Sequence, residues 1–249
     1  MPSIDENFEF WNNYDWRDGG DEWSEVWGTT ENLWLGSLLP RIRSYIPVPR
    51  ILEIAPGFGR ITHFLKDYCD ELVIVDLTQR CVDACRKRFA EETKIVYQIN
   101  DGKSLPEVRS HSIDFAFSFD SLVHVEIDVI VAYLTEFARV LSADGIAFIH
   151  HSNIAVYRDS STNGLTIAND HWRGSSVSAE IVRTVSAEVG LSCIRQEVVN
   201  WGVPHLTDCF STFTPAGSRH EAQFDLIENP NFMDEAIELG QRGLPTEGD

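Results

Sequence analysis

The sequence of 249 residues is short of positive charge. It has 20 Lys and Arg residues against 39 Asp and Glu residues, which gives a formal net charge of −19 at pH 7. Phosphate-rich nucleic acids and anionic membrane surfaces repel a protein of this sign. We therefore expect no nucleic-acid partner and no docking on a membrane.

Long hydrophobic runs are also absent. No stretch approaches the length of about 18 uninterrupted apolar residues that a membrane-spanning helix needs. The first residues lack the basic and apolar segments of a signal peptide, so none is expected. The five cysteines are scattered and do not show the paired spacing of a zinc site. These absences favour a cytoplasmic protein with reduced thiols.

The rest of the composition is that of an ordinary globular protein, with 43% hydrophobic and 24% charged residues. The acidic residues gather at the ends, because residues 1–31 carry a net charge of −8 and residues 221–249 a net charge of −7. Five of the seven tryptophans lie within the first 34 residues, namely Trp11, Trp16, Trp23, Trp27 and Trp34. An acidic, tryptophan-rich head therefore precedes a nearly neutral body.

Residues 50–151 alternate between short apolar runs and amphipathic helical patterns. The apolar runs predict buried strands at 50–55, 71–76, 94–99, 113–119 and 146–150. The helical pattern is strongest at 129–141, where apolar side chains recur on one face. Strands that alternate with helices predict an α/β fold with a mostly parallel sheet and helices on both faces, because parallel neighbours need crossover connections.

The second half of the chain follows a looser pattern. After a polar segment at 152–176, the sequence predicts a helix that ends at Gly190 and an antiparallel hairpin at 191–199 and 206–213. A short helix is expected at 231–239. We divide the chain into an N-terminal helical cap or lid (1–49), a core (50–215) and an acidic C-terminal tail (216–249), all within a single domain.

A glycine-rich turn follows the first predicted strand and opens a helix, in the run Glu53-Ile54-Ala55-Pro56-Gly57-Phe58-Gly59. Gly57 and Gly59 lack a Cβ atom, so a ligand can approach the main chain closely there. The spacing is not the Gly-x-Gly-x-x-Gly of dinucleotide-binding proteins. Taken alone, this turn fits a structural role as well as a binding role.

Acidic residues close the next three predicted strands. Asp76 ends the second strand, Asp101-Gly102 follows the third, and Phe119-Asp120 ends the fourth. The carboxyl ends of such strands meet in one crevice where the strand order reverses. In that crevice Asp76 could bind both hydroxyls of a ribose, and Asp101 could accept a hydrogen bond from an adenine amino group.

In this order, the motifs resemble those of the class I S-adenosylmethionine-dependent methyltransferases. The resemblance covers residues 50–151 closely. It implies a Rossmann-like, seven-stranded sheet with an antiparallel last strand. It also implies S-adenosyl-L-methionine as methyl donor and S-adenosyl-L-homocysteine as product. Ala55 departs from the family pattern, because it stands where the family usually has its first glycine.

The resemblance also implies which residues hold the cofactor. Glu53 and the glycine-rich turn would hold the methionine part, Asp76 the ribose and Asp101 the adenine. Family members usually close the pocket with N-terminal helices, so Trp23, Trp27 and Trp34 of the head could cover the cofactor or the acceptor, although they could equally only pack the cap onto the sheet. The full set of expected cofactor residues is Glu53, Ala55, Gly57, Gly59, Asp76, Leu77, Asp101, Gly102, Phe119 and Trp27.

Methyl transfer to a hydroxyl group needs a residue that removes the proton, and histidine suits this role near neutral pH. His124 lies in the loop after the fourth strand, and His150 and His151 end the fifth, where alternation points them to opposite faces. Each of these histidines could also be purely structural. We select His124, His151 and Asp120 as candidate catalytic residues, and Trp23, His171 and Arg173 as candidate acceptor contacts.

Asp120, His124 and Glu126 lie close together in the sequence, but a set that includes histidine suits Mg²⁺ poorly, so no metal is predicted. We predict a cytoplasmic biosynthetic methyltransferase that acts at a hydroxyl or carboxyl oxygen of a small molecule, sugar or peptide, and that could form a homodimer. The alternatives are an N-methyltransferase on an amine or ring nitrogen, a non-catalytic cofactor-binding interaction module, and a dinucleotide oxidoreductase.

Overall fold

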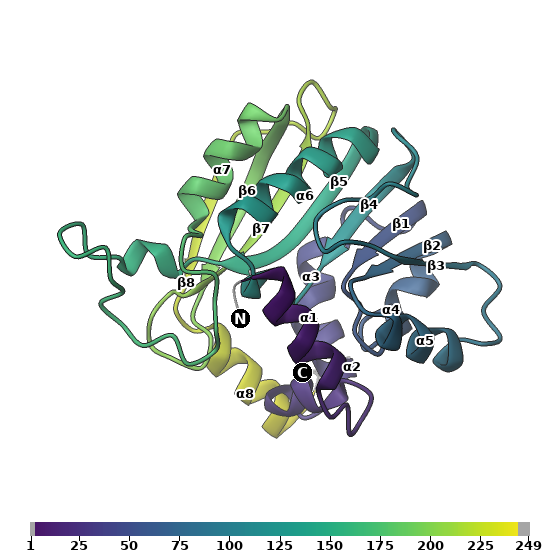
Figure 1. The fold of residues 1–249 in the computed structure, drawn as a ribbon, viewed down its shortest axis with the longest axis horizontal. Coiled ribbons are helices and arrows are strands. Elements are labelled where there is room, and N and C mark those ends of the chain that lie inside the picture. Colours follow the sequence, from purple (N-terminus) through teal and green to yellow (C-terminus); the bar gives the residue numbers. More distant parts are fainter. Residues whose placement is uncertain (1–2, 244–249) are drawn as a thin grey trace.

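A computed structural model describes residues 3–243 of the chain (Figure 1). Its centre is an eight-stranded sheet in the order β3-β2-β1-β4-β5-β7-β6-β8. The predicted parallel strands are confirmed as β1 (Val48–Ile54), β2 (Cys69–Asp76), β3 (Ile95–Ile99), β4 (Ile113–Ser118) and β5 (Leu141–Ser152). The strand order reverses between β1 and β4, so the carboxyl ends of these strands face one crevice.

The other three strands complete the sheet. β6 (Leu191–Val199) and β7 (Asp208–Pro215) pair antiparallel, as the hairpin pattern predicts, and β7 inserts between β5 and β6. The prediction of seven strands is wrong, because β8 (Asp225–Asn229) runs parallel to β6 at the edge. The sequence gives little signal for β8, since Leu226 is exposed and backbone pairing holds most of the strand.

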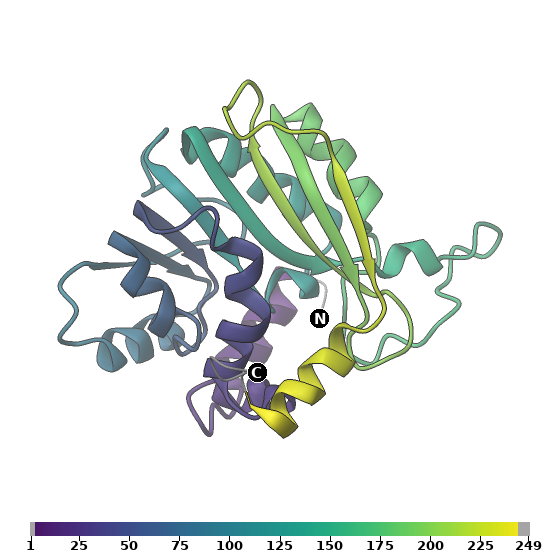
Figure 2. The same ribbon diagram turned by 180° about the vertical axis from the view of Figure 1, so that it is seen from behind.

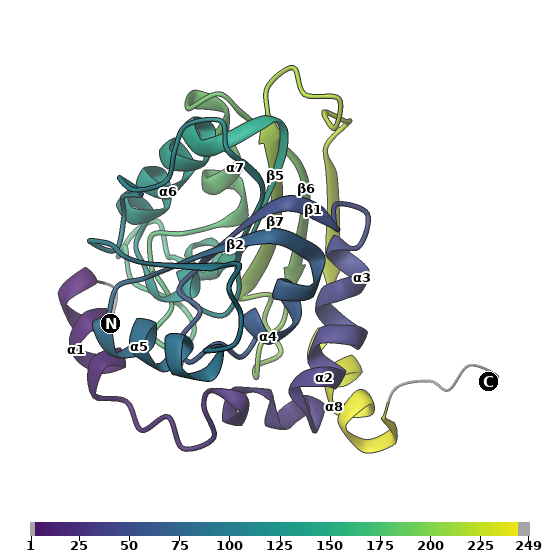
Figure 3. The ribbon, with the colours of Figure 1, turned by 90° about the vertical axis from the view of Figure 1, so that its right-hand side faces the viewer.

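Helices cover both faces of the sheet (Figures 2 and 3). On one face, α6 (Ile127–Val140) and α7 (Ala179–Glu188) pack on the sheet. α6 begins close to the predicted start at 129, and α7 ends close to the predicted Gly190. The opposite face carries the helical segment α2 (Thr30–Asn32), η2 (Leu33–Leu38) and α3 (Leu39–Ile42), together with α4 (Thr62–Leu65), η3 (Lys66–Tyr68), α5 (Gln79–Arg88) and α8 (Phe232–Arg242). The short 3₁₀ segments η4 (Leu122–His124) and η5 (Ile154–Tyr157) follow β4 and β5.

The N-terminal head forms α1 (Ile4–Asn13) and the 3₁₀ helix η1 (Asp21–Trp27). Ser3 and Glu6 form a capping box at the start of α1, which satisfies backbone groups of its first turn. The Asn7 side chain donates a hydrogen bond to the His124 carbonyl (2.8 Å), and Arg80 donates to the carbonyl of Tyr14 (2.8 Å). These bonds hold the head across the carboxyl ends of the parallel strands.

The C-terminal helix α8 packs against η1 of the head, next to α2 (Figure 3). The contact is close, because a Cβ atom at Gly240 would lie 2.5 Å from the carbonyl oxygen of Val26. Within residues 3–243, no helix is both long enough and apolar enough to cross a membrane.

The closeness of α8 to η1 leads to a stability prediction. Gly240→Ala should lower the free energy of unfolding by about 1–3 kcal/mol, because the added methyl group meets backbone atoms that cannot rotate away. The thermal unfolding midpoint should fall by roughly 3–8 °C. Gln241→Ala changes the neighbouring exposed side chain and should leave the midpoint within about 2 °C. A stable Gly240→Ala variant would contradict this packing.

Candidate functional site

The glycine-rich turn after β1 has three residues with left-handed backbone. Gly57 has φ +58° and Gly59 has φ +86°, which glycine adopts without steric strain. Ala55 has φ +55°, and its N–H donates to the Val75 carbonyl of β2 (2.7 Å). Ala55 therefore occupies a conformation that favours glycine, the residue usual at this place in the family that the sequence resembles.

One cavity of about 700 Å³ lies over the ends of β1 and β2, and we call it the Asp76 cavity. The Asp76 carboxylate is buried there and accepts hydrogen bonds from the Thr78 backbone N–H (2.8 Å) and hydroxyl (3.1 Å). Burial raises its pKa to about 6, although these hydrogen bonds oppose the shift. Leu77, Asn100 and Gly102 also line this cavity.

A second cavity of about 570 Å³, the Glu53 cavity, adjoins the first. Glu53 is buried and accepts a hydrogen bond from the Thr62 hydroxyl (2.6 Å), and burial raises its pKa to about 7. Phe119, one of the expected cofactor residues, also lines this cavity. The residues shared by the linings of the two cavities are Trp11, Trp16, Ile54, Ala55, Gly57 and Asp120.

Two tryptophans that the sequence did not single out cover these cavities. Trp16 stacks on Phe58 of the glycine-rich turn, with ring centroids 4.8 Å apart and an interplanar angle of 13°. Trp11 lines both cavities beside it. A Cβ atom at Gly57 would lie 2.8 Å from the Trp16 ring, so glycine is needed there for the ring to close over the turn.

A third cavity of about 830 Å³, the aromatic cleft, lies on the other side of Asp120. Indole rings from four separate segments line it, together with acidic, basic and apolar side chains. The lining comprises Trp11, Trp23, Trp27, Trp172 and Trp201 with Glu22, Glu25, Asp120, His124, His171, Arg173, Val26, Val123 and Met233. All three residues that the sequence predicts as acceptor contacts, Trp23, His171 and Arg173, are therefore at this cleft.

Asp120 borders all three cavities. Its backbone is left-handed, with φ +57°, and its carboxylate pairs with Arg60 (Nη2 to Oδ2, 3.0 Å). Arg60 in turn donates to the Ser24 hydroxyl of the head (3.1 Å). Arg60 follows the glycine-rich turn, and only its position there could have marked it in the sequence.

His124 lies half-buried in the lining of the Glu53 cavity and of the aromatic cleft. Burial lowers its pKa, so the ring is neutral at pH 7. Its Nδ1 atom faces the Trp172 carbonyl oxygen at 3.4 Å, which places the ring hydrogen on Nδ1. Nε2 then keeps its lone pair and can accept a proton.

The structure contradicts the selection of His151 as a catalytic residue. His151 is buried, with Nε2 2.7 Å from the Ser211 hydroxyl and Nδ1 2.8 Å from the Ser152 carbonyl oxygen. Within residues 3–243 it lines none of the three cavities, and burial lowers its pKa to about 4. Alternation does separate the two histidines of β5, and His150 is the one that contacts Asp120.

Three predicted cofactor residues are also placed differently. Asp101 is exposed and turns back to accept hydrogen bonds from the backbone N–H groups of Lys103 (3.0 Å) and Ser104 (2.7 Å). A Cβ atom at Gly59 would lie 2.5 Å from the Phe89 ring, so Gly59 serves the packing of α5. Trp27 is buried, donates to the Ser37 hydroxyl (2.9 Å) and borders the aromatic cleft only.

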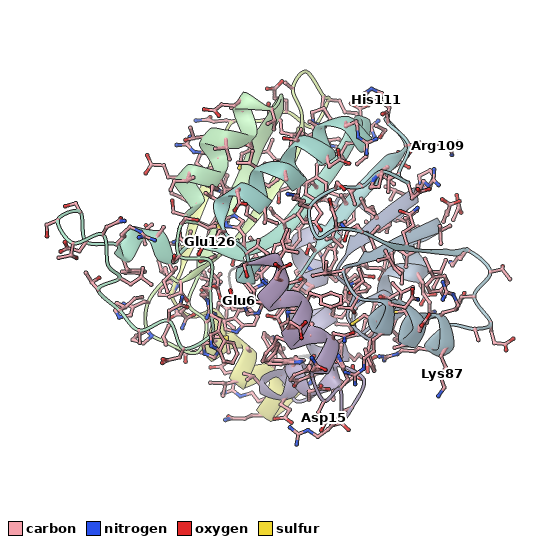
Figure 4. All side chains as sticks on the ribbon, in the orientation of Figure 1. Glu6, Asp15, Lys87, Arg109, His111 and Glu126 are labelled. Carbon is pink, nitrogen blue, oxygen red and sulfur yellow. The ribbon has the colours of Figure 1, made fainter. Side chains whose placement is uncertain are left out.

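No group of three or more His, Cys, Asp or Glu side chains in the described part of the chain is arranged to hold a metal ion. Glu126, labelled in Figure 4, instead accepts hydrogen bonds from the backbone N–H groups of Ser175 (3.1 Å) and Ser176 (2.7 Å). It therefore fastens the start of α6 to the segment that carries Trp172 and Arg173.

Comparison with known proteins agrees with this geometry. Residues 51–145 match the family model described as a methyltransferase domain. The comparison with curated proteins found no match.

Several solved structures share the fold. The PH0226 protein of Pyrococcus horikoshii OT3 is 18% identical, with a TM-score of 0.56 over 73% of this chain and 89% of that chain. The N-methyltransferase NodS of Bradyrhizobium japonicum WM9 is 16% identical, with a TM-score of 0.55 over 75% and 97%. An S-adenosylmethionine-dependent methyltransferase of Mesorhizobium loti is 14% identical, with a TM-score of 0.55 over 76% and 99%.

The left-handed backbone of Ala55 gives a second prediction. Ala55→Gly should raise the free energy of unfolding by about 1 kcal/mol, because glycine removes the clash between Cβ and the carbonyl oxygen. The thermal midpoint should rise by roughly 2–4 °C. Ala132→Gly in the middle of α6 is the control, and it should lower the midpoint. Equal losses of stability in the two variants would contradict strain at Ala55.

Proposed function

We propose that the chain is a class I S-adenosylmethionine-dependent methyltransferase and that it methylates a hydroxyl oxygen of a small acceptor bound in the aromatic cleft. The match of residues 51–145 to a methyltransferase domain supports the first part of this proposal. The observation that carries the proposal is the position of Asp120 and His124. Both residues border the Glu53 cavity and the aromatic cleft, so they stand where a methyl donor and an acceptor would meet.

The residues of the two cofactor cavities suit S-adenosyl-L-methionine. The buried Asp76 carboxylate would accept hydrogen bonds from the ribose hydroxyls, and buried Glu53 would face the positive ammonium group of the methionine part. Leu77, Asn100 and Gly102 would enclose the adenine. The aromatic faces of Trp11 and Trp16 would attract the sulfonium charge.

The bound cofactor supplies the activated methyl carbon, so the protein has to orient the acceptor and remove its proton. His124 Nε2 would accept the proton that the acceptor hydroxyl loses as its oxygen forms the new bond to carbon. Asp120, held by Arg60, would accept a hydrogen bond from the acceptor and keep its oxygen in line. His171 and Trp23 would contact the remainder of the acceptor.

The charges around the cleft narrow the acceptor class. Glu22, Glu25 and Asp120 all line the cleft, and a carboxylate acceptor would be repelled by them. Arg173 offers little compensation, because its Nε and Nη2 groups both donate to the buried carboxylate of Asp208, which balances its charge. A neutral hydroxyl of a sugar, a peptide or a natural product suits the cleft better than a carboxyl oxygen does.

A second candidate is methyl transfer to an amine nitrogen, and the side chain of Glu22 favours it. Its Oε2 accepts a hydrogen bond from the Gly20 N–H (2.9 Å), whereas Oε1 is buried and has no hydrogen-bond partner among the described residues. A buried carboxylate oxygen beside several indole rings would attract a positively charged amine. The same cleft thus suits either nucleophile, and the role of His124 distinguishes them.

Cofactor binding should depend on pH through Glu53 and Asp76. Their pKa values of about 7 and about 6 mean that both carboxyls are largely protonated at pH 5.5. Because only the ionised forms accept hydrogen bonds at both oxygens, the Kd of S-adenosyl-L-homocysteine should fall at least about tenfold between pH 5.5 and pH 8. Isothermal titration calorimetry measures this Kd at each pH. Asp76→Asn should weaken binding and reduce the dependence of the Kd on pH.

The stability of the unliganded protein should depend on pH in the opposite direction from the cofactor affinity. The pKa of each of these carboxyls is raised on folding, so their contribution to stability is fully present below pH 4 and is lost as the pH rises through 6 and 7. Thermal unfolding of Glu53→Gln should lose this part of the pH dependence. A cofactor affinity that does not change with pH would contradict ionised carboxylates in the cofactor site.

Replacement of His124 tests the reaction itself. Hydroxyl and amine compounds are incubated with S-adenosyl-L-methionine, and mass spectrometry detects a product heavier by one CH₂ unit. For a hydroxyl acceptor, His124→Gln should lower kcat by about 100-fold or more, with an unchanged Kd for S-adenosyl-L-homocysteine. His171→Gln in the same cleft should mainly raise KM.

The outcomes separate the two candidates. A loss of less than about threefold in His124→Gln with an amine acceptor would favour nitrogen methylation, because an amine requires orientation more than a general base. Binding of a nicotinamide dinucleotide in place of S-adenosyl-L-homocysteine would overturn both candidates.

A further inference from the structure

His150 lies directly behind Asp120 and is completely buried on β5. The backbone N–H of Asp120 donates a hydrogen bond to His150 Nδ1 (3.2 Å). The imidazole is held between aromatic rings, with centroid distances of 5.3 Å to Phe119, 4.9 Å to Trp201 and 4.7 Å to Phe210. Its orientation toward Asp120 is therefore fixed by packing.

The other ring nitrogen faces a buried carboxylate. Nε2 of His150 lies 3.7 Å from Asp208 Oδ2, and Asp208 is fully buried and bound by Arg173 through both oxygens. Because Nδ1 accepts a hydrogen bond, a neutral ring carries its hydrogen on Nε2, which points to this negative charge. Asp208 and Arg173 therefore favour the tautomer that leaves Nδ1 free to accept from Asp120.

Asp120 needs such support. Its φ of +57° is a conformation that residues other than glycine keep only where their surroundings hold it. Two contacts act on it, one at the backbone from His150 and one at the carboxylate from Arg60. Loss of the backbone contact would free the Asp120 main chain to leave this strained conformation.

We propose that His150 is a positioning residue, which holds the Asp120 backbone so that its carboxylate stays at the junction of the cofactor cavities and the aromatic cleft. This inference rests on the proposed function, because that function makes the junction the place of methyl transfer. In the described residues His150 lines none of the three cavities, so it would act through Asp120 and not on the substrate.

The contacts extend on both sides of His150. On one side Arg173, which binds Asp208, belongs to the lining of the aromatic cleft. On the other side Asp120 binds Arg60, which reaches Ser24 of the head. The positioning role thus ties the acceptor side of the site to the cap that covers the cofactor side.

Two substitutions separate the roles of the two ring nitrogens. His150→Asn puts an amide oxygen near the place of Nδ1, so it can still accept from Asp120. His150→Gln puts its amide near the place of Nε2 and leaves the Asp120 N–H without this acceptor. His151→Asn is the matched control, because it alters the neighbouring buried histidine, whose contacts are on the opposite face of β5.

The measurements are amide hydrogen exchange by NMR and the Kd of S-adenosyl-L-homocysteine by calorimetry, with the full chain. In His150→Gln we expect exchange at Asp120 to become at least about tenfold faster and the Kd to rise about tenfold. His150→Asn and His151→Asn should stay within about threefold of the wild type in both measurements. In the wild type, ¹⁵N spectra of histidine should show a neutral His150 ring with its hydrogen on Nε2.

Three results would overturn the proposal. The first is an unchanged Asp120 amide in His150→Gln, and the second is an equal loss in His150→Gln and His150→Asn, which indicates packing alone. The third is a wild-type His150 that carries its hydrogen on Nδ1, a result that needs no variant to fold. If the wild type binds no S-adenosyl-L-homocysteine, the proposed function fails, and the exchange and tautomer results still decide the role of His150.

Discussion

The burial of carboxylates is the constraint on which the rest of this structure depends. A carboxylate removed from water loses its hydration and stays ionised only where charges or hydrogen-bond donors replace it. Asp208 has such a replacement, because Arg173 outweighs the effect of burial and lowers its pKa to about 2. Glu53 and Asp76 are bound only by hydroxyl and N–H groups, and burial raises their pKa values. Asp208 is thus fixed as a structural charge, whereas a bound ligand can change the ionisation of Glu53 and Asp76.

The need to pair carboxylates with arginines brings distant segments of the chain together near the crevice between β1 and β4. Arg60 follows the first strand, yet its guanidinium group links Asp120 at the end of β4 to Ser24 in the head. Arg173 comes from the segment after β5 and meets Asp208 at the start of β7. Arg60 thus pairs with a carboxylate at the end of β4, and Arg173 pairs with a carboxylate at the start of β7. The Arg60 contacts therefore join the head to the sheet, and the Arg173 contact joins the lining of the aromatic cleft to the sheet.

The sequence predicts the sheet well and the directions of its side chains less well. Periodicity marks seven of the strands, because each buries apolar residues, whereas β8 pairs mainly through its backbone and escapes detection. Alternation places His150 and His151 on opposite faces but does not reveal which face carries the site. Asp101 follows its strand as expected, yet its side chain satisfies its own turn. These details depend on register and local hydrogen bonds. The cytoplasmic location and the homodimer stay predictions.

The acidic head has two kinds of carboxylate, and its net charge hides the difference. Glu6 and Asp15, labelled in Figure 4, are exposed to solvent, where they act on the surroundings only weakly. Glu22 and Glu25 belong to the same head but line the aromatic cleft. Glu25 is exposed, whereas Glu22 is partly buried and its Oε1 atom is shielded from water. Since an electrostatic interaction strengthens as water is excluded, the charge of Glu22 would act on a molecule in the cleft far more than its share of −19 implies. Under the proposed function, the head would therefore contribute to acceptor selection by charge as well as by the flat surfaces of its tryptophans.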